Sequence, residues 1–473
     1  MPFNLNPVTQ TRCDARRAYF DPIAERPNLS VLTGQFVTQL VVDGVATRED
    51  TTVPLGVSSA DGQGEASGGL GGMYGPGSSP NSTDHSHAIP RQAYRRMIAS
   101  LRRVKRWLQG RQGSSATGLY TVTGVQYAAN AHSPRQTVSA TREVIISAGA
   151  IHSPQLLMLS GIGPAEVLST HGIPNLVDLP GVGNNLQDHA QVWCNYPYYN
   201  NTFPAPTDLI TNDTFLEQAQ AAYWANRTGP WTTGWIDGVA FPSLPAITDN
   251  ILTTLHSALS QHPSRHLPAN TDPTVLAGYT AQLPLLLAAL HSTTRAAYEI
   301  LNSNDGVLPV ANMRPLSRGT LTLKTSHPFD PPLINPRYGS NPTDIQILLA
   351  AILFNRRLLA TSALSELDPA QLYPPVDATE EDIVDWIYGN LQTEYHPGGT
   401  CAMMPLELGG VVNSELIVYG TRNLRVVDAS VFPLLPAAHL QAVVYGVAEK
   451  VSLLLRERGR GLVALFADVG VGG

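Results

Sequence analysis

Residues 142–150 read Arg-Glu-Val-Ile-Ile-Ser-Ala-Gly-Ala, and this stretch sets the fold that we expect. Val144 to Ile146 are apolar at every position, which suits a strand buried on both faces of a parallel sheet. A glycine turn follows, and Ser153 and Pro154 then match the N-cap and first position of a helix over residues 155–160. A strand, a glycine turn and a capped helix in this order are typical of a nucleotide-binding α/β layer.

The size and composition of the chain limit the possible classes of protein. Its 473 residues could hold about three domain-sized units or one large two-domain enzyme. With 43% hydrophobic and 14% charged residues, the composition is that of a globular protein. A net charge of −7 argues against nucleic acid as the main partner, because phosphate binding needs a positive surface.

Cysteines and sequons say little about where the protein works. Cys13, Cys194 and Cys401 allow at most one disulfide and make neither a disulfide framework nor a metal cluster. Five N-glycosylation sequons lean mildly toward a secretory route, although such triplets also arise by chance. They begin at Asn28, Asn81, Asn200, Asn212 and Asn226. No signal peptide is visible after Met1, so secretion would require one further upstream, and the protein would otherwise be cytoplasmic.

Two segments before the first strand of the α/β layer differ in character from the rest. Residues 58–90 are rich in Gly, Ser, Asp and His, which indicates a flexible, poorly ordered insert. Residues 95–111 combine many basic side chains with apolar ones at helical spacing. A membrane-surface or partner-binding helix, a solvated surface helix and extraneous sequence from an imperfect gene model all stay open for this segment.

No uninterrupted apolar run reaches the length of a membrane span. Residues 275–290 come closest, but Thr, Gln and Pro interrupt the run, so an amphipathic core helix is the better interpretation. Helices of ordinary amphipathic pattern are also expected at residues 344–359 and 380–391. We therefore expect no membrane span in this chain.

The carboxyl third contains residue types that suit acid–base chemistry. Residues 395–400 read Tyr-His-Pro-Gly-Gly-Thr, and residues 423–430 form an apolar strand that ends in Asp-Ala-Ser. His439 follows, at the start of a helix expected over residues 440–455. An imidazole can hold or release a proton near neutral pH, which suits His396 and His439 to deprotonating an alcohol.

Taken in this order and spacing, the carboxyl segment resembles the C-terminal signature of the glucose-methanol-choline (GMC) family of flavin oxidoreductases. Residues 149–163 are similar to the second family signature and are quite specific at that length. Further family-like blocks follow the order of the family, at residues 180–189, 314–324, 331–338 and 409–430. The resemblance covers residues 6–43 and 118–460, and it is nearest to fungal members of the glucose oxidase and aryl-alcohol type.

The resemblance implies an α/β FAD-binding domain, Rossmann-like but incomplete, with an α+β substrate domain built on an antiparallel sheet. Residues 1–190 would supply the remainder of the FAD-binding domain, interrupted by an irregular insert at residues 44–117. Residues 191–390 would form the substrate-binding domain. Residues 391–462 would return to the FAD domain with the catalytic histidines, and residues 463–473 would form a tail.

The chemistry that the resemblance implies is hydride transfer from an alcohol to FAD. His396 would be the general base that takes the hydroxyl proton as hydride leaves the carbinol carbon. His439 would hydrogen-bond the substrate oxygen and share its developing charge, although a purely capping role at the helix start stays open. Electrons would pass on to oxygen or another acceptor, so the implied partners are a small-molecule alcohol and an electron acceptor.

The resemblance also assigns residues that would contact FAD. The helix after His439 would point the positive end of its dipole toward the reduced flavin. The other assigned contacts are made largely by the backbone, for which ordinary strand packing stays open as an alternative. The expected cofactor residues are Val37, Ala148, Gly149, Asp428, Ala429, Leu440 and Gln441.

Three residues just before and beside the first histidine are expected to line the substrate pocket: Gln392, Glu394 and Tyr395. Glucose-specific members of the family place an Arg and an Asn where this chain has Gln392 and Glu394, so glucose is not the expected substrate. Asp188 and His189 invite a metal interpretation, but no ligand set accompanies them in the sequence. We therefore expect no metal.

Members of the family usually begin with a strand and a Gly-x-Gly-x-x-Gly turn whose helix binds the FAD pyrophosphate, and no full match occurs here. Residues 68–77 are glycine-rich but lack the required spacing. A truncated gene model, a true fragment and a degenerate relative all stay open, and the first is favoured because the catalytic-looking end is undamaged. Poor or absent FAD binding is then expected. A non-redox cyclase or lyase of the same fold and a non-catalytic remnant are the alternative functions.

Overall fold

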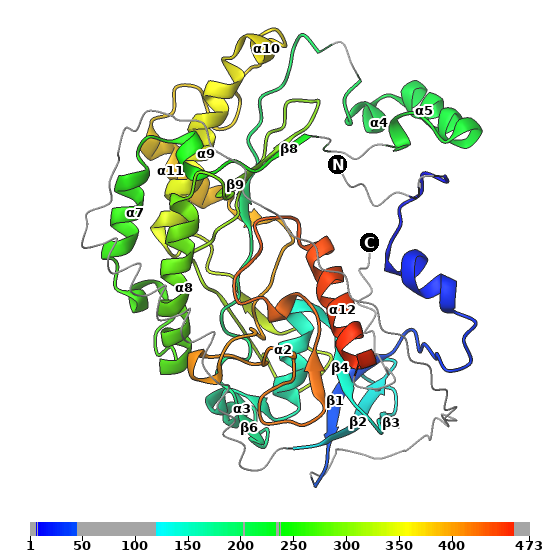
Figure 1. The fold of residues 1–473 in the computed structure, drawn as a ribbon. Coiled ribbons are helices and arrows are strands. Elements are labelled where there is room, and N and C mark those ends of the chain that lie inside the picture. The colour runs from blue at the N-terminus through cyan, green and yellow to red at the C-terminus, as the bar shows by residue number, and fades with distance from the viewer. Residues whose placement is uncertain are drawn as a thin grey trace, which may run out of the picture.

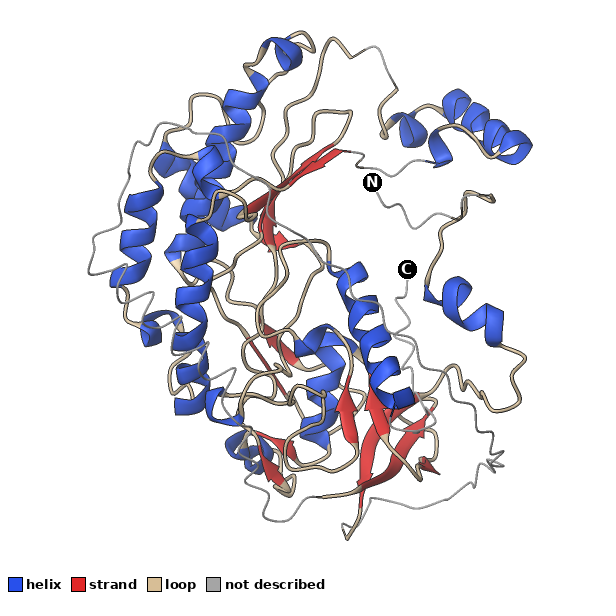
Figure 2. Ribbon diagram, in the orientation of Figure 1, coloured by secondary structure: helices blue, strands red, loops and turns tan. Residues whose placement is uncertain are grey.

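The computed structural model describes residues 6, 8–44, 120–201, 204–232, 236 and 238–457 (Figure 1). Apart from Gly44, the expected insert and its basic segment lie outside these residues, as does the expected tail. The described chain packs around two large hydrophobic cores, one for each of two parts. Figure 2 shows that strands occur in both parts, while most of the helices line one side of the second.

The first part contains two small sheets. An antiparallel sheet joins three strands in the order β1 (Phe36–Val42), β2 (Val122–Ala128) and β3 (Gln136–Ser139). A parallel pair joins β4 (Val144–Ile146) to β14 (Leu424–Val426), so that segments far apart in the sequence lie side by side. All three residues of β4 are buried, which confirms the strand predicted from its run of apolar residues.

Helix α2 (Gly149–Leu159) begins earlier than the sequence predicts, and Pro154 lies inside the helix rather than at its first position. Gly149 has a φ of +78°, a left-handed conformation that favours glycine, and it makes the turn from β4 into the helix. Because proline has no N–H, the carbonyl of Ala150 loses its partner within the helix. The hydroxyl of Thr400 donates to that carbonyl at 2.6 Å, which explains how the helix accommodates the proline.

The second part is built on a five-stranded sheet. Its strands lie in the order β13 (Gln392–Thr393), β7 (Ala190–Val192), β10 (Val310–Asn312), β9 (Tyr298–Asn302) and β8 (Gly238–Ala240). Every neighbouring pair in this sheet is antiparallel. The helices that enclose the second core are α7 (Ile251–Ser260), α8 (Pro273–His291), α9 (Pro342–Leu359) and α11 (Glu380–Asn390) (Figure 1). Helix α9 contacts β9 and β10 directly.

Helices α9 and α11 confirm two of the predicted helices, and their sequences show why they begin where they do. The side chain of Asn341 caps α9 by accepting the N–H of Thr343 at 3.0 Å. A capping box starts α11, in which Thr379 and Asp382 each accept a backbone N–H of the other.

Helix α8 is the only described helix that is long and apolar enough to cross a membrane, judged by length and composition alone. Its residues Leu286, Leu287 and Leu290 are buried in the second core. The side chain of Asp272 caps the helix by accepting the N–H of Thr274 at 2.8 Å. This placement fits the core helix predicted for this region.

Further strand pairs and helices complete the described chain. Two strand pairs are β5 (Ile162–Gly163) with β6 (Val177–Asp178), which is parallel, and β11 (Thr320–Thr322) with β12 (Leu333–Asn335), which is antiparallel. The other α-helices of the described chain are α3 (Ala165–Thr170), α4 (Asp208–Thr211), α5 (Asp213–Asn226), α6 (Leu244–Ile247), α10 (Ser362–Ser365) and α12 (Leu440–Glu457). Helix α12 starts at the predicted residue. Leu321 and Leu323 pack into the first core, although they lie in the range expected for the substrate domain.

Candidate functional site

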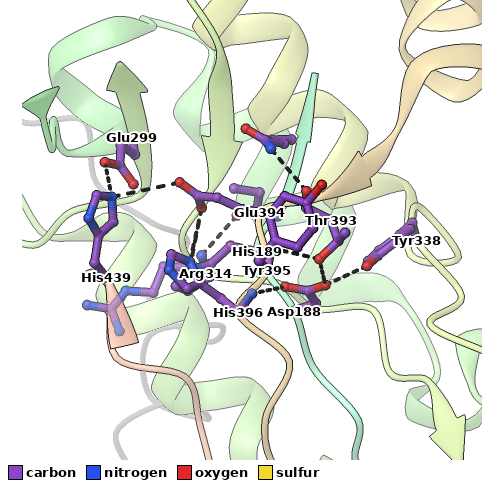
Figure 3. A network of polar contacts seen from close by, with 12 residues as sticks. Asp188, His189, Glu299, Arg314, Tyr338, Thr393, Glu394, Tyr395, His396 and His439 are labelled. Carbon is purple, nitrogen blue, oxygen red and sulfur yellow. Dashed lines mark hydrogen bonds and ion pairs between the residues drawn. The ribbon is translucent and has the colours of Figure 1, made fainter. Parts of the chain in front are cut away.

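Five imidazole and carboxyl side chains converge on one cluster (Figure 3). His189 immediately precedes β7, and Glu299 lies on β9. Glu394 and His396 follow β13, while His439 precedes α12. Strands β13, β7, β10 and β9 are successive neighbours in one sheet, so the sheet brings the first four of these side chains to the same place.

The two predicted catalytic histidines lie close together. The ring centroids of His396 and His439 are 5.4 Å apart, and the ring planes are inclined by 40°. The ring of His189 also contacts His396, with a centroid separation of 5.1 Å and nearly perpendicular planes. The Nδ1 atoms of His189 and His396 are 3.1 Å apart. The structure therefore joins the two predicted histidines and adds a third imidazole.

Asp188 holds the loop that carries His396. Its Oδ1 accepts the backbone N–H of His396 at 3.1 Å, and its Oδ2 accepts the hydroxyls of Tyr338 and Thr393, each at 2.5 Å. The Thr393 hydroxyl oxygen accepts the N–H of Tyr395 at 2.8 Å. Tyr395 has a φ of +61°, an uncommon conformation for a residue with a side chain. A largely buried carboxylate and a strained turn thus fix the backbone of His396.

The surroundings of the two histidines move their pKa values in opposite directions. The Nε2 atom of His439 lies 2.7 Å from Oε1 of Glu299, and this hydrogen bond raises the pKa of His439. Burial lowers the pKa of His396 to about 4, and the nearby His439 contributes to this shift. At neutral pH His396 is therefore uncharged and able to accept a proton, whereas His439 is the better proton donor.

Glu394 is the one predicted pocket residue that lies within the cluster. Its side chain is only 8% exposed, and its Oε2 atom is 3.4 Å from Nδ1 of His396. Burial and the neighbouring Glu299 raise the pKa of Glu394 to about 10, so it is uncharged at neutral pH. The other two predicted pocket residues, Gln392 and Tyr395, are exposed, Tyr395 to 82%.

One group of predicted cofactor residues lies where β4 and β14 end. Asp428 Oδ2 accepts the N–H of Gly149 at 3.0 Å and the hydroxyl of Ser153 at 2.6 Å. Ala148 and Ala429 are the chain neighbours of these residues. Asp428 thus ties the start of α2 to the end of β14. Ser153 serves in this tie, which corrects the expectation that it caps a helix.

The remaining predicted cofactor residues lie at the start of α12 and on β1. Leu440 and Gln441 form the first turn of α12, and Val37 on β1 packs against the first core. Beside the start of α2 there is open space. The N-cap residue, Ala148, makes no side-chain cap, so Asp428 is the side chain that accepts the first N–H of the helix. A side chain built at Gly149 would meet nothing within 4 Å. A helix start with room in front of it suits an anionic or strongly polar group.

Sequence reasoning missed His189 and Glu299 as members of the cluster. Glu299 carried a signal, because it is a lone acid among the apolar residues of β9 and is completely buried. No ligand set accompanies His189 in the sequence, but two possible ligand atoms lie near it in the structure. Glu394 Oε2 and His396 Nδ1 lie 3.7 and 3.1 Å from Nδ1 of His189.

The fold and the site together define a class of protein. Paired histidines with opposite pKa shifts meet where an α/β part with parallel strands joins an antiparallel sheet, an arrangement suited to moving a proton. Two family models, both described as GMC oxidoreductase, match residues 93–191 and 315–448. The chain belongs to the GMC oxidoreductase family, which confirms the family predicted from the sequence motifs.

Similar proteins include fungal ones. The GMC oxidoreductase family protein Mala s 12 of Malassezia sympodialis is 35% identical, over 94% of this chain and 59% of that protein. Patulin synthase of Aspergillus clavatus is 36% identical, over 67% of this chain and 49% of that protein. The chain therefore spans about half to three fifths of the length of these curated relatives.

Solved structures match the fold as well. An FAD-dependent oxidoreductase from Chaetomium thermophilum has a TM-score of 0.78 and 26% identity, covering 97% of this chain and 67% of that one. A fungal aryl-alcohol oxidase has a TM-score of 0.65 and 35% identity, covering 71% of this chain and 58% of that one.

Proposed function

We propose that the chain acts as an FAD-dependent oxidoreductase on the CH–OH groups of small-molecule alcohols. The observation that carries the proposal is the contact between His396 and His439, whose rings lie 5.4 Å apart. Alcohol oxidation needs one group that takes the hydroxyl proton and another that stabilises the negative charge on oxygen. The opposite pKa shifts of the two rings suit them to these two tasks.

His396 is the general base in this proposal. Its Nδ1 atom faces His189, so Nε2 is the nitrogen that takes the proton. The ring is only 15% exposed and uncharged at neutral pH, and the hydrogen bond from its backbone to Asp188 holds it in position.

His439 stabilises the substrate oxygen. Its Nε2 atom is engaged by Glu299, so Nδ1 is the nitrogen that donates to the oxygen. The buried carboxylate of Glu299 favours the charged imidazolium, which makes the ring a stronger hydrogen-bond donor.

The open start of α2 and the start of α12 both suit binding to FAD. The chemistry that bound FAD would supply is the acceptance of a hydride. The positive end of the α12 dipole would favour negative charge on the reduced ring, and the open backbone beside Gly149 would admit a close approach. The residues that would hold the cofactor are Val37, Ala148, Gly149, Asp428, Ala429, Leu440 and Gln441.

The neighbours of His439 favour an apolar alcohol over a sugar. The ring of Phe241 packs edge-on to His439, with centroids 6.2 Å apart, and so lines the site with an aromatic surface. The uncharged Glu394 adds no fixed negative charge at neutral pH. The similarity to an aryl-alcohol oxidase supports the same substrate class. Oxygen or another acceptor would take the electrons.

Flavin content and flavin reduction test the proposal. The purified protein, supplied with FAD, should show flavin absorbance that bleaches anaerobically with a member of a panel of aryl, polyol and polyketide alcohols. His396→Asn should slow the bleaching by about 10²–10⁴-fold without changing the flavin content, because it removes only the base. His132→Asn, in the exposed turn between β2 and β3, is the matched control. Equal rates in His396→Asn and the wild type would contradict the base, and a flavin that no alcohol reduces would contradict the substrate class.

A further inference from the structure

Three atoms that can bind a metal ion lie together in the cluster of Figure 3. Nδ1 of His189 is 3.1 Å from Nδ1 of His396 and 3.7 Å from Oε2 of Glu394. The third side of this triangle, from His396 Nδ1 to Glu394 Oε2, measures 3.4 Å. The pairing of β13 with β7 sets this geometry, because the N–H of Glu394 donates to the carbonyl of His189 at 3.0 Å.

The triangle has the dimensions of one face of a zinc coordination tetrahedron. Zinc lies about 2.0–2.2 Å from nitrogen and oxygen ligands, so two ligands of a tetrahedral ion are roughly 3.3–3.6 Å apart. The three observed separations average within that range and depart from it by about 0.2 Å at most. The backbone would therefore need almost no movement to admit the ion.

The hydrogen bonding of these atoms also leaves room for a cation. The side chain of Glu394 is 8% exposed, yet neither of its oxygens accepts a hydrogen bond within the described chain. A buried carboxyl group without hydrogen-bond partners is costly, and it is satisfied when it releases its proton and coordinates a metal. The facing Nδ1 atoms of His189 and His396 can share only one proton between them, whereas a metal ion would accept both lone pairs.

We propose that His189, Glu394 and His396 form a binding site for a divalent transition-metal ion of the zinc class. Two imidazoles and one carboxylate favour zinc or cobalt over magnesium or calcium, which prefer oxygen ligands. Beside the triangle, Nε2 of His439 lies 4.0 Å from Oε1 of Glu394, and the His439 side chain is 51% exposed, which gives the ion a route from solvent.

The neighbouring group of Glu299, Glu394 and His439 is a poorer site. His439 Nε2 and Glu299 Oε1 are 2.7 Å apart, which is the length of a hydrogen bond and shorter than the separation of two ligands on one zinc ion. These two atoms are therefore already partners in a hydrogen bond. Glu394 takes no part in that bond and can complete the triangle with His189 and His396.

The metal and the general base exclude each other. A metal ion on Nδ1 of His396 keeps the remaining ring proton on Nε2, so that nitrogen cannot accept a proton from an alcohol. The bound ion therefore inhibits proton transfer reversibly, and a chelator restores it. This consequence rests on the proposed function, but binding of the ion does not.

Cobalt absorption tests the site without any need for flavin. Chelator-treated, dialysed protein titrated with Co²⁺ should bind one equivalent, with the visible d–d bands of a four-coordinate ion, and Zn²⁺ should displace it. Glu394→Gln keeps the size of the side chain and should weaken binding by more than about a hundredfold, since even outer partners of a metal ligand contribute 10–100-fold. His396→Asn should weaken binding to the same extent. It is preferred to a change at His189, because His189 is completely buried and its loss could prevent folding.

His327→Asn is the matched control. His327 forms a separate histidine–carboxylate contact at the surface, 3.7 Å from Asp330, and its loss should leave Co²⁺ binding unchanged. No cobalt spectrum in the wild type, or a spectrum that survives in Glu394→Gln, would overturn the site. A protein that oxidises alcohols but binds no cobalt would contradict the metal site and leave the proposed function standing. A protein that binds cobalt but no flavin would contradict the proposed oxidoreductase activity and leave the metal site standing.

Discussion

At the scale of single residues, His396 and His439 have the same side chain but different proton affinities, because their neighbours differ. His396 is largely buried, which disfavours its charged form, whereas His439 is half exposed and bonds to the buried Glu299. The first ring is therefore suited to accept a proton and the second to donate one. A third ring, His189, is completely buried, and burial also lowers its pKa.

The pH dependence of kcat/KM for alcohol oxidation should therefore be bell-shaped. As pH falls through the pKa of His396, about 4, that ring becomes protonated and activity is lost. As pH rises past the raised pKa of His439, that ring loses the proton that stabilises the substrate oxygen, and activity falls again. Glu299→Gln removes the carboxylate that raises this second pKa, so the alkaline limb should move to lower pH.

Steady-state kinetics of the wild type and Glu299→Gln, from about pH 3 to pH 10, would measure both limbs. The acid limb should move little in the variant, since burial is the main cause of the His396 shift. An alkaline limb that stays in place would show that a group other than His439 sets it. His132→Asn should shift neither limb.

At the scale of elements, helix α2 depends on a residue from another part of the chain. Pro154 removes one hydrogen bond from the helix, and the hydroxyl of Thr400 replaces it at the carbonyl of Ala150. Both Ala150 and Thr400 are buried, so an unpaired carbonyl there would be costly. The residues that carry His396 and those that begin α2 are thereby joined.

Thr400→Val should lower the free energy of unfolding by about 1–3 kcal/mol, because it leaves that buried carbonyl without a donor while keeping the volume of the side chain. Pro154→Ala restores an N–H within the helix, so Pro154→Ala/Thr400→Val should recover most of the loss. Urea denaturation of the wild type, both single variants and the double variant would give the free energies of unfolding for a double-mutant cycle. Simple additivity of the two effects would show that the Thr400 hydroxyl does not replace the missing bond.

Sequence patterns predicted those features that depend on local chemistry. The regular apolar spacing was enough to predict α9 and α11, and the caps at Asn341 and Thr379 explain where they begin. The early start of α2 was missed because its compensating hydroxyl lies 250 positions away. A cluster residue that lies within a recognisable motif, such as His396, could be assigned to the site from the sequence.

Features that depend on tertiary pairing could not be predicted in the same way. Glu299 reaches the cluster only because β9, β10 and β7 are neighbours in the sheet, and no motif reports that order. The same holds for His189, whose partners follow β13. The exposure of Gln392 and Tyr395 also depends on how the loop after β13 is held, which Asp188 decides.

At the scale of the whole molecule, flavin affinity depends on residues from segments that are far apart in the sequence. The expected cofactor residues come from β1, the start of α2, the end of β14 and the start of α12. The sequence contains no Gly-x-Gly-x-x-Gly turn, whose helix start would bind a pyrophosphate. Within the described chain the parallel pair β14–β4 is joined by no third strand, so a further parallel strand could pair with its edge.

A chimera should therefore bind FAD more tightly than this chain. We would fuse the strand, glycine turn and helix of a GMC relative ahead of residue 6 and measure the dissociation constant by quenching of flavin fluorescence. Two charge-assisted hydrogen bonds to the pyrophosphate, each worth about 1.5–3 kcal/mol, predict a gain of at least about a hundredfold. FAD should then raise the melting temperature of the chimera more than that of the chain alone. The same fusion with its turn glycines changed to alanine is the control, because it keeps the added length but blocks the approach of the phosphates. Equal affinity in all three proteins would mean that the residues of this chain already hold the whole cofactor.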